Sequence, residues 1–226
     1  MDSDLQWRSR HLFVNSAAAM KYLAIFGLGV GLAISAVDAS AQTVAHGVTE
    51  YKLCASCHGF RGEGNQLVNA PALGGQQGWY LERQIANFRK GVRGGANSDT
   101  NSQAMALMTR GLDSESRVKD IVAYIATLPV ADPDATLQGD VEKGRALYAT
   151  CAACHGPTAE GNEVLNAPAL TTLGDWYQLS QLKAFKDGNR GTHPDDTFGQ
   201  QMRPMASVLV DEQAMRDVVT FIGTLK

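Results

Sequence analysis

The sequence has 226 residues, of which 44% are hydrophobic, 19% are charged and 7% are aromatic, a composition typical of a folded protein. This length accommodates one or two domains and excludes a large multidomain assembly. Twenty basic residues against 23 acidic ones give a net charge of −3, so the chain lacks the basic excess typical of nucleic-acid binding. We therefore expect no nucleic-acid partner.

The first 41 residues are predicted to be a signal peptide with an upstream extension. Lys21 precedes an apolar run over 22–37, and small residues follow in an A-x-A arrangement at 39–41. This order is typical of a secretory signal peptide cleaved after Ala41, and it predicts export to the periplasm. The run is shorter than the ~20 apolar residues that cross a bilayer, although retention as an anchor stays open. Met20 is the expected initiator.

The rest of the chain repeats itself at a constant offset of 97 residues. The motif C-x-x-C-H at 54–58 recurs at 151–155, and the closing segments match in the same way. One shift without a gap aligns all repeated positions, which indicates a tandem duplication of one module. Further repeated pairs are Glu63/Glu160, Asn69/Asn166, Pro71/Pro168, Trp79/Trp176, Tyr80/Tyr177, Phe88/Phe185, Arg93/Arg190, Met105/Met202 and Met108/Met205.

A short linker separates the two copies. Two prolines and two acidic residues lie in the segment 129–134, which predicts a fairly stiff connection rather than a continued helix. We name residues 42–130 module 1 and residues 131–226 module 2. Each is small for a self-sufficient hydrophobic core, and domains of this size usually need a staple or a cofactor.

The predicted fold is all-α. Helical patterns run over 43–53 and 142–150 into the two C-x-x-C-H motifs. A helix over 79–90 places Tyr80, Gln84 and Phe88 on one face, and Gly91 ends it. Closing helices begin at Asp113 and Asp211, which supply capping side chains. Each closing helix carries an apolar stripe, formed by Val118, Ile121, Val122, Ile125 and Leu128 in module 1 and by Val218, Val219, Ile222 and Leu225 in module 2.

Glycine-rich, proline-marked loops are expected between these helices, with no alternating pattern that would indicate strands. Each module carries a pair of methionines in such a loop before its last helix, 47 residues after the histidine of the motif.

The motif C-x-x-C-H predicts covalent haem attachment in both modules. Two thiols one helical turn apart, Cys54 with Cys57 and Cys151 with Cys154, can reach the two vinyl groups on one porphyrin edge. The histidine that follows, His58 or His155, then meets the iron as an axial ligand. A zinc site would leave the histidines unexplained, a thioredoxin-like pair needs a βαβ setting, and structural disulfides favour scattered cysteines.

The second axial position of each iron decides between carrying electrons and performing chemistry. Met105 or Met108 in module 1, and Met202 or Met205 in module 2, offer a soft thioether that favours ferrous iron. Spacing alone leaves open which methionine of each pair binds, and the other is expected to pack in the core.

These motifs resemble class I cytochrome c, duplicated as in the dihaem cytochrome c4 family, over essentially all of 42–226. The resemblance implies an N-terminal helix crossed by the C-terminal one, with Gly47 and Tyr51 facing Tyr124 and Leu128, and Gly144 and Tyr148 facing Phe221 and Leu225. Counting back eight residues from the final helix's capping position, it implies Met105 and Met202 as ligands. It also implies that the carbonyl groups of Pro71 and Pro168 accept the Nδ1 protons of the axial histidines.

Other repeated residues carry weaker expectations. Trp79, Tyr80, Trp176 and Tyr177 are not diagnostic of that family and are expected to pack as a wall against haem. Arg93 and Arg190 could pair with haem propionates, although a solvated loop charge is as good an interpretation. His46 and His193 are expected to be surface histidines rather than ligands.

The function expected from this resemblance is an exported dihaem electron carrier rather than an enzyme. It would take single electrons from a quinol-oxidising complex or dehydrogenase and pass them to a terminal oxidase or reductase. A dihaem subunit of a larger oxidoreductase, of the flavocytochrome sulfide dehydrogenase type, stays open, as does a loose membrane association. A dihaem peroxidase or a thiosulfate-oxidising cytochrome is less favoured because the modules do not diverge around the distal ligand.

Charge differs between the modules. Module 1 has nine basic and seven acidic residues, and module 2 has eight and thirteen. Such an asymmetry would orient the protein in a partner's field, and it suggests that the two ends serve different redox partners.

Overall fold

The computed structural model describes residues 39–226, in which regular structure is helical apart from two isolated β-bridges, Asn65 with Ala70 and Asn162 with Ala167. Most of the predicted signal peptide lies outside the described residues, and its cleavage point after Ala41 stays a prediction. None of the described helices is long and apolar enough to cross a membrane. The helices are α1 (Ala39–His58), a 3-10 turn (Gln66–Val68), α2 (Gly78–Arg89), α3 (Thr100–Thr109), α4 (Glu115–Ile125), α5 (Val141–His155), α6 (Asp175–Lys186), α7 (Thr197–Ser207) and α8 (Glu212–Gly223).

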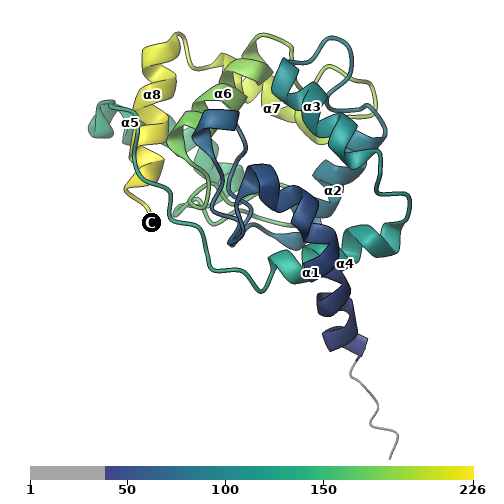
Figure 1. Ribbon diagram of the computed structural model, residues 1–226. Coiled ribbons are helices and arrows are strands. Elements are labelled where there is room, and N and C mark those ends of the chain that lie inside the picture. The colour runs from purple at the N-terminus through teal and green to yellow at the C-terminus, as the bar shows by residue number, and fades with distance from the viewer. Residues whose placement is uncertain (1–38) are drawn as a thin grey trace, which may run out of the picture. The chain divides into compact units, whose positions relative to one another are not determined.

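Each module is organised around the crossing of its first and last helices, α1 with α4 and α5 with α8 (Figure 1). Glycine makes this close approach possible, because a Cβ atom at Gly47 would lie 2.0 Å from the carbonyl oxygen of Asp120. The same atom at Gly144 would lie 2.0 Å from the carbonyl oxygen of Asp217. Any side chain at these two positions would push the helices apart. The predicted helix crossing is therefore present in both modules.

Aromatic rings fill the space beside the crossing. The rings of Tyr51 and Tyr124 lie 5.2 Å apart, and those of Tyr148 and Phe221 lie 5.4 Å apart. Both buried tyrosines also donate a hydrogen bond to the carbonyl group that follows the motif histidine, Tyr51 to Gly59 at 2.8 Å and Tyr148 to Gly156 at 2.7 Å. The ring thus ties each crossing to the end of its C-x-x-C-H helix.

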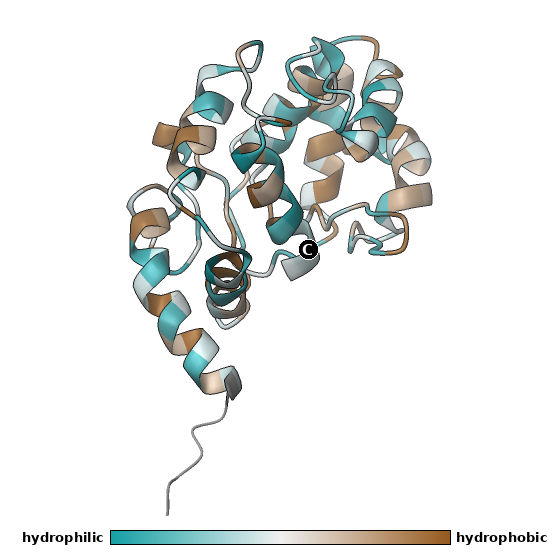
Figure 2. Ribbon diagram, turned by 90° about the vertical axis from the view of Figure 1, so that its right-hand side faces the viewer, coloured by the Kyte–Doolittle hydropathy of each residue, from teal (hydrophilic) through white to brown (hydrophobic). Residues whose placement is uncertain are grey.

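The closing helices bury the apolar stripes that the sequence predicts. Helices in Figure 2 carry both hydrophilic and hydrophobic stretches, as expected of helices with one buried side. The largest of the fully buried side chains concentrate on α4 and α8 and at Leu209 just before α8. They are Val118, Ile121, Ile125, Val218, Val219 and Leu209.

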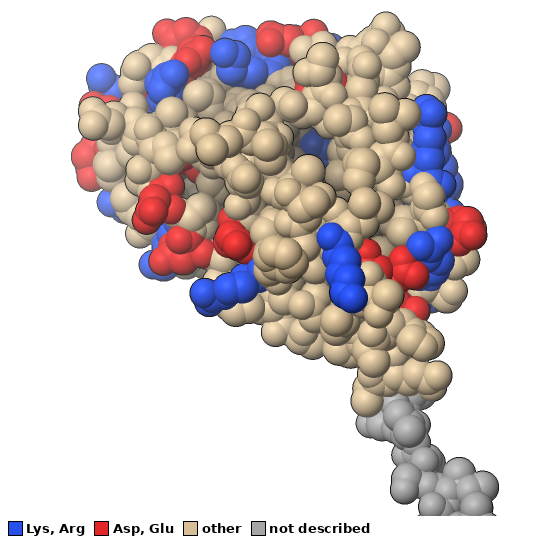
Figure 3. Space-filling model, in the orientation of Figure 1, with Lys and Arg blue, Asp and Glu red and all other residues tan. Residues whose placement is uncertain are grey.

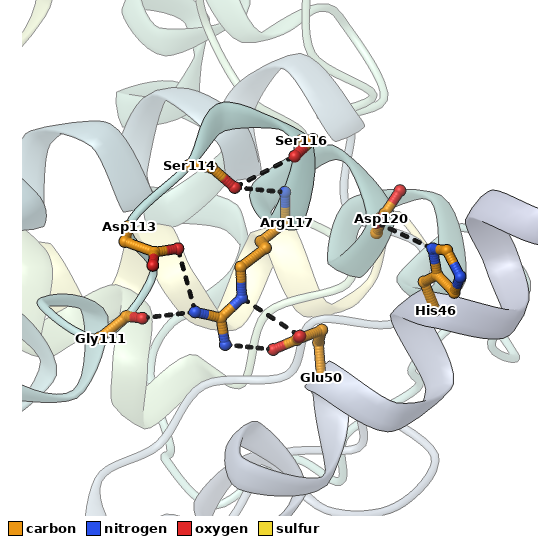
Figure 4. Close-up of polar contacts among 8 residues, drawn as sticks. All are labelled: His46, Glu50, Gly111, Asp113, Ser114, Ser116, Arg117 and Asp120. Carbon is orange, nitrogen blue, oxygen red and sulfur yellow. Dashed lines mark hydrogen bonds and ion pairs between the residues drawn. The ribbon is translucent and has the colours of Figure 1, made fainter.

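The two crossings differ on their solvent side. In module 1, Arg117 on α4 donates to both carboxylate oxygens of Glu50 on α1 and also contacts Asp113 (Figure 4). At the corresponding positions module 2 has Leu147 in place of Glu50 and Ala214 in place of Arg117, and both pack against its core. An ion pair in one copy is thus replaced by apolar contact in the other.

The methionine pairs lie on helices, which corrects the prediction that they occupy loops. Met105 and Met108 are in α3, and Met202 and Met205 are in α7. These helices begin at the capping side chains of Asp99 and Asp196. The start of α3 is rich in polar residues and this helix has no clear apolar face, whereas α7 has an apolar face but contains Pro204, a residue typical of a helix end.

Other predicted boundaries and faces also change. The helices α1 and α5 continue through the whole C-x-x-C-H motif to the histidine rather than ending before it. Ser114, not Asp113, caps α4, whereas Asp211 caps α8 as predicted. In α2 the buried residues are Leu81, Ile85 and Phe88. The predicted face with Tyr80 and Gln84 instead meets module 2.

The linker is longer than the predicted segment 129–134, because no regular structure is present over 129–140, and near its end this longer linker is anchored to the start of α6. Asp175, at the start of α6, accepts hydrogen bonds at 2.7 Å from the backbone amides of Thr136 and Leu137 and from the Thr136 hydroxyl. Burial alone would raise the pKa of Asp175, but the hydrogen bonds from Thr136, Leu137 and Trp176 outweigh it and hold the pKa below its ordinary value. Module 1 has Gly78 at this position.

Candidate functional site

The two motif helices present their cysteines and histidine at equivalent places. Cys54 and Cys151 are partly buried in the cores of their modules, and all four cysteines are free thiols. The histidine is the last residue of each helix, and the glycine after it has a positive φ of 83° or 84°, which lets the chain turn back. Thiols three residues apart lie on one side of a helix, with the histidine one residue beyond.

Both motif histidines are buried and held in one tautomer. His58 Nδ1 lies 2.7 Å from the carbonyl oxygen of Pro71, and His155 Nδ1 lies 2.8 Å from that of Pro168. A carbonyl oxygen only accepts, so Nδ1 carries the proton and Nε2 keeps its lone pair. Burial lowers the pKa of both rings, and the hydrogen bonds to the prolines oppose it only in part. Two neutral imidazoles, each with a free Nε2, are therefore presented to a cavity.

A cavity adjoins each motif. The first has a volume of about 930 Å³ and is lined by Cys54, Cys57, His58 and Met105. The second has a volume of about 180 Å³ and is lined by the equivalent residues of module 2, which are Cys151, Cys154, His155 and Met202. Two thiols, an imidazole and a thioether thus converge on one space in each module.

Both methionines of each pair line the cavity, but they differ in exposure. Met105 and Met202 are half-buried, whereas Met108 is 42% exposed and Met205 is 41% exposed. Because a ligand sulfur has to be held away from water inside the module, burial favours the first methionine of each pair.

The cavities share lining residues at the boundary between the modules. Tyr80 and Gln84 from α2, and Tyr177 and Gln181 from α6, line both cavities. These residues are two pairs at the 97-residue offset. The sequence prediction missed Gln84 and Gln181 as cavity residues. Their recurrence at the repeat offset was the signal that could have identified both.

Two arginines cross the boundary in opposite directions. Arg93 donates to Gln84 of its own module at 2.8 Å, and to Tyr177 at 3.0 Å and Gln181 at 2.8 Å in the other module. Arg190 donates to Gln181 at 2.7 Å, and across the boundary to Tyr80 at 3.2 Å and Gln84 at 3.1 Å.

These two guanidinium groups make no ion pair with a carboxylate of the described residues. Arg93 is 7% exposed, and its Nε atom is buried without a hydrogen-bond partner in that part of the chain. Burial alone would raise the pKa of Tyr80, but the positive charges of Arg190 and Arg93 hold it below its ordinary value. A buried positive charge of this kind calls for an anion nearby.

The residues present fit a haem in each module. The apolar cavities and free thiols suit a porphyrin edge, and the free Nε2 atom and the thioether are suitable donors for iron. The orphaned Arg93 Nε and the absence of a carboxylate partner for either arginine, within residues 39–226, match the two carboxylates that a haem carries.

Other predicted residues lie apart from the cavities. Trp79 and Trp176 are outside the lining of both, as the described residues define it, whereas their tyrosine neighbours are inside. His46 pairs with Asp120 at 3.7 Å (Figure 4), and His193 lies 3.9 Å from Asp195.

On the face shown in Figure 3, Lys or Arg atoms are visible at the bottom of a recess.

Comparison with known proteins gives consistent similarities. The family model described as cytochrome c matches residues 44–129 and again 141–226. Cytochrome c4 of Stutzerimonas stutzeri is 33% identical over 182 residues, which cover 76% of this chain and 83% of that protein.

Two further comparisons concern function and fold. The thiosulfate dehydrogenase electron acceptor of Thiomonas intermedia (strain K12) is 33% identical over 155 residues, 62% of this chain and 66% of that protein. The crystal structure of reduced recombinant cytochrome c4 from Pseudomonas stutzeri has a TM-score of 0.59 at 24% identity, covering 79% of this chain and 96% of that one, and shows the same fold.

Proposed function

Because the chain belongs to the cytochrome c family and is a dihaem, cytochrome c4-like electron carrier, we propose that it is exported to the periplasm and shuttles single electrons there. Its donor would be a quinol-oxidising complex or a dehydrogenase, and its acceptor a terminal oxidase or reductase. The chain has two cytochrome c domains and carries two covalent haem c groups. The predicted signal peptide supports the proposed location.

The cysteines of each motif would hold the haem covalently. Each thiol of Cys54, Cys57, Cys151 and Cys154 would hold the group by adding across one vinyl C=C bond, with a C–S bond formed and the thiol proton passed to the neighbouring vinyl carbon. This addition changes no oxidation state. When bound, the haem iron supplies one-electron chemistry between its ferrous and ferric forms.

The axial donors would be His58 with Met105 and His155 with Met202. The hydrogen bond from each Nδ1 to a proline carbonyl fixes the ring and makes Nε2 a stronger donor. A thioether on the other side favours ferrous iron and raises the potential. With both axial positions held by the protein, small molecules are kept from the iron, which suits a carrier.

Arg93 and Arg190 would neutralise haem carboxylates at the boundary between the modules. Their hydrogen-bond partners among the described residues are neutral amide and phenol groups, and each guanidinium group also lies over a phenylalanine ring, so these contacts orient the arginines without cancelling their charge. Each arginine also lines the cavity of its own module, where its positive charge would disfavour the extra positive charge of ferric iron and so raise the potential.

The observation that carries the ligand assignment is the convergence of a free imidazole nitrogen and a half-buried methionine on one thiol-lined cavity in each module. We test it with Met105→Ala and Met202→Ala, each against its exposed partner, Met108→Ala or Met205→Ala. The first variant of each pair should lose the sulfur-to-iron charge-transfer band of one haem, and the second should keep it. The opposite pattern would overturn the assignment.

A second candidate donor follows from one relative. The protein from Thiomonas intermedia is named as an electron acceptor of thiosulfate dehydrogenase. We propose thiosulfate dehydrogenase as an alternative donor and test it by mixing the oxidised protein with that enzyme and thiosulfate. Rapid haem reduction that requires both the enzyme and thiosulfate supports this donor. The donor is excluded if the enzyme and thiosulfate leave the haems oxidised in a sample that a quinol-oxidising complex does reduce.

The unequal charge of the modules supports separate docking sites for donor and acceptor. Reversing several exposed acidic residues of module 2 should then change the exchange rate with one partner and leave the other unchanged. Equal changes with both partners would contradict separate docking.

A further inference from the structure

The loop that positions the axial histidine of module 2 is held by side chains of module 1. This loop contains Pro168, whose carbonyl oxygen accepts the hydrogen bond from His155 Nδ1 at 2.8 Å. The next residue, Ala169, donates its backbone amide to Gln77 Oε1 at 2.8 Å and accepts at its carbonyl from Gln76 Nε2 at 3.1 Å. Gln77 also donates to the carbonyl group of Glu160 at 2.9 Å.

The contact to Gln77 involves the same peptide group that binds the histidine. The carbonyl of Pro168 and the amide of Ala169 are the two ends of one planar peptide unit. When the amide end donates to Gln77, the peptide becomes more polarised and its carbonyl becomes a better acceptor. A better acceptor strengthens the bond from Nδ1 and makes Nε2 more basic.

Module 1 has no such arrangement. His58 binds Pro71 in the same way, but the backbone amide of the buried Ala72 donates a hydrogen bond to no residue of the described chain. The reciprocal contact cannot form, because the positions equivalent to Gln76 and Gln77 in module 2 are Leu173 and Gly174. The duplication therefore retains the histidine–proline bond in both copies and has the extra bond in only one.

A second contact holds the start of the same loop. Arg83 on α2 donates to the side-chain and backbone oxygens of Asn166 at 2.7 and 2.9 Å, and its guanidinium lies 4.6 Å from the ring centre of Phe198. The equivalent residue in module 2 is Ser180, which is too short to do the same. Module 1 side chains therefore bind the histidine loop of module 2 at both of its ends, and module 2 makes no equivalent contacts to the histidine loop of module 1 among the described residues.

We infer that Gln77 of module 1 is a positioning residue for the haem iron of module 2, and that it lowers the potential of that haem through the Ala169–Pro168–His155 hydrogen-bond chain. A more basic axial nitrogen stabilises ferric over ferrous iron, which gives the direction of the effect. This inference rests on the proposed ligation by His155. It makes the potential of one haem depend on a side chain of the other module.

The test is Gln77→Met, which keeps the length of the side chain and removes its hydrogen bonds. Gln77 is half-buried at the boundary between the modules, so the far-UV circular dichroism and the haem content of the variant are compared with those of the unmodified protein to confirm that it folds. Gln76→Met is the control, because it removes a bond to the carbonyl group of Ala169 and one from the backbone amide of Gln77, but no bond to the Pro168–Ala169 peptide group. In a redox titration of the dihaem protein, Gln77→Met should raise the potential of the module 2 haem only. Gln76→Met should shift it less.

Proton NMR of the unmodified protein and of Gln77→Met provides a second measurement. In the reduced, diamagnetic state the Nδ1 proton of His155 should resonate further downfield than that of His58, and Gln77→Met should reduce the difference. Unchanged potential and unchanged proton shift in Gln77→Met would overturn the inference. So would an equal shift of the potential in the Gln76→Met control.

Failure of the underlying ligation would look different. His155→Ala should abolish the low-spin spectrum of one haem if His155 is an axial ligand. Loss of that spectrum together with an unaffected Gln77→Met variant removes only the role of Gln77. Retention of the spectrum in His155→Ala would remove the proposed ligation itself.

Discussion

The two modules repeat one helical skeleton but surround their cavities differently. In both, a glycine lets the first and last helices cross, a tyrosine ties the crossing to the motif, and a proline carbonyl holds the histidine. The cavity of module 1 measures about 930 Å³ and extends along α6 of the other module, whereas that of module 2 measures about 180 Å³. The duplication has thus kept the groups that attach haem and varied the groups around it.

This difference shows how one sequence motif can be placed in two different surroundings, which we expect to give the two haems different potentials. Module 2 has the linker anchored on Asp175, and its histidine loop is held by Gln76, Gln77 and Arg83. Module 1 has neither feature, but it contains the more deeply buried arginine, Arg93. We therefore expect the two haems to differ in potential although their proposed ligands are the same.

The largest expected effect tests what the modules share. Gly47→Ala and Gly144→Ala each place a methyl group 2.0 Å from a backbone carbonyl oxygen, so the helices have to separate. Each substitution should lower the free energy of unfolding of its module by about 3 kcal/mol or more. Denaturant unfolding followed by hydrogen exchange of α1 and α5 measures this. A tolerated alanine at either position would mean that the crossings are not equivalent.

The next effect is confined to module 2. Asp175→Asn removes the negative charge that accepts three hydrogen bonds from the linker, and it should lower the free energy of unfolding by about 2–3 kcal/mol. Asp134→Asn, an exposed acid of the same linker, is the control and should change little.

The contribution of Asp175 should also depend on pH. Its pKa in the folded protein lies below the ordinary 3.8, so the folded state binds this proton less tightly than the unfolded chain. The stabilisation is therefore complete well above pH 3.8 and is lost as the pH falls through the lower pKa of the folded state. Unfolding curves of the two proteins should converge in acid, and a constant difference down to the lowest pH would contradict this role.

A smaller effect concerns the potentials. Arg93 lines the cavity of module 1, so removing its charge in Arg93→Gln should lower the potential of the haem held there by roughly 40–90 mV, which corresponds to about 1–2 kcal/mol. Arg190→Gln should act in the same direction but less, because Arg190 is more exposed. Redox titration checks both variants. A rise in potential after either substitution would rule out the proposed neutralisation of haem carboxylates.

The smallest expected effect separates the two crossings by their response to salt. The Arg117–Glu50 pair holds α1 to α4 in module 1, where module 2 has apolar residues instead (Figure 4). Glu50→Gln should slightly speed hydrogen exchange in α1 at low ionic strength and have no effect at high ionic strength. Exchange in α5 should stay unchanged throughout, and equal responses of both helices would show that the ion pair has no local role.

Repetition explains how much of this molecule could be predicted. Cys54, His58 and their copies were identifiable because the motif is short, local and repeated at one offset. The apolar stripe of α4 was identifiable because burial imposes a helical period. Helices α3 and α7 were missed for different physical reasons, since the segment after Asp99 is polar and has no clear apolar face, and the segment after Asp196 contains Pro204, which indicates a helix end.

The contacts between the modules could not be predicted in the same way. Gln77 and Ala169 are 92 residues apart and meet only because two folded modules pack together. Gln77 also has no copy at the repeat offset, so the duplication gives no hint of its role. Arg93 and Arg190 were predictable only in part. Their repetition at the offset of 97 identified them as candidate site residues, but it did not predict their hydrogen-bond partners in the other module.

The central claim is that both modules bind iron through one histidine and one methionine. Electron paramagnetic resonance of the fully oxidised exported protein tests this claim most directly. Intact mass spectrometry of the same sample gives the number of attached haems. We predict two attached haems and two low-spin signals of the histidine–methionine type. A high-spin or bis-histidine signal from either module, or a mass that corresponds to one haem, would contradict the account.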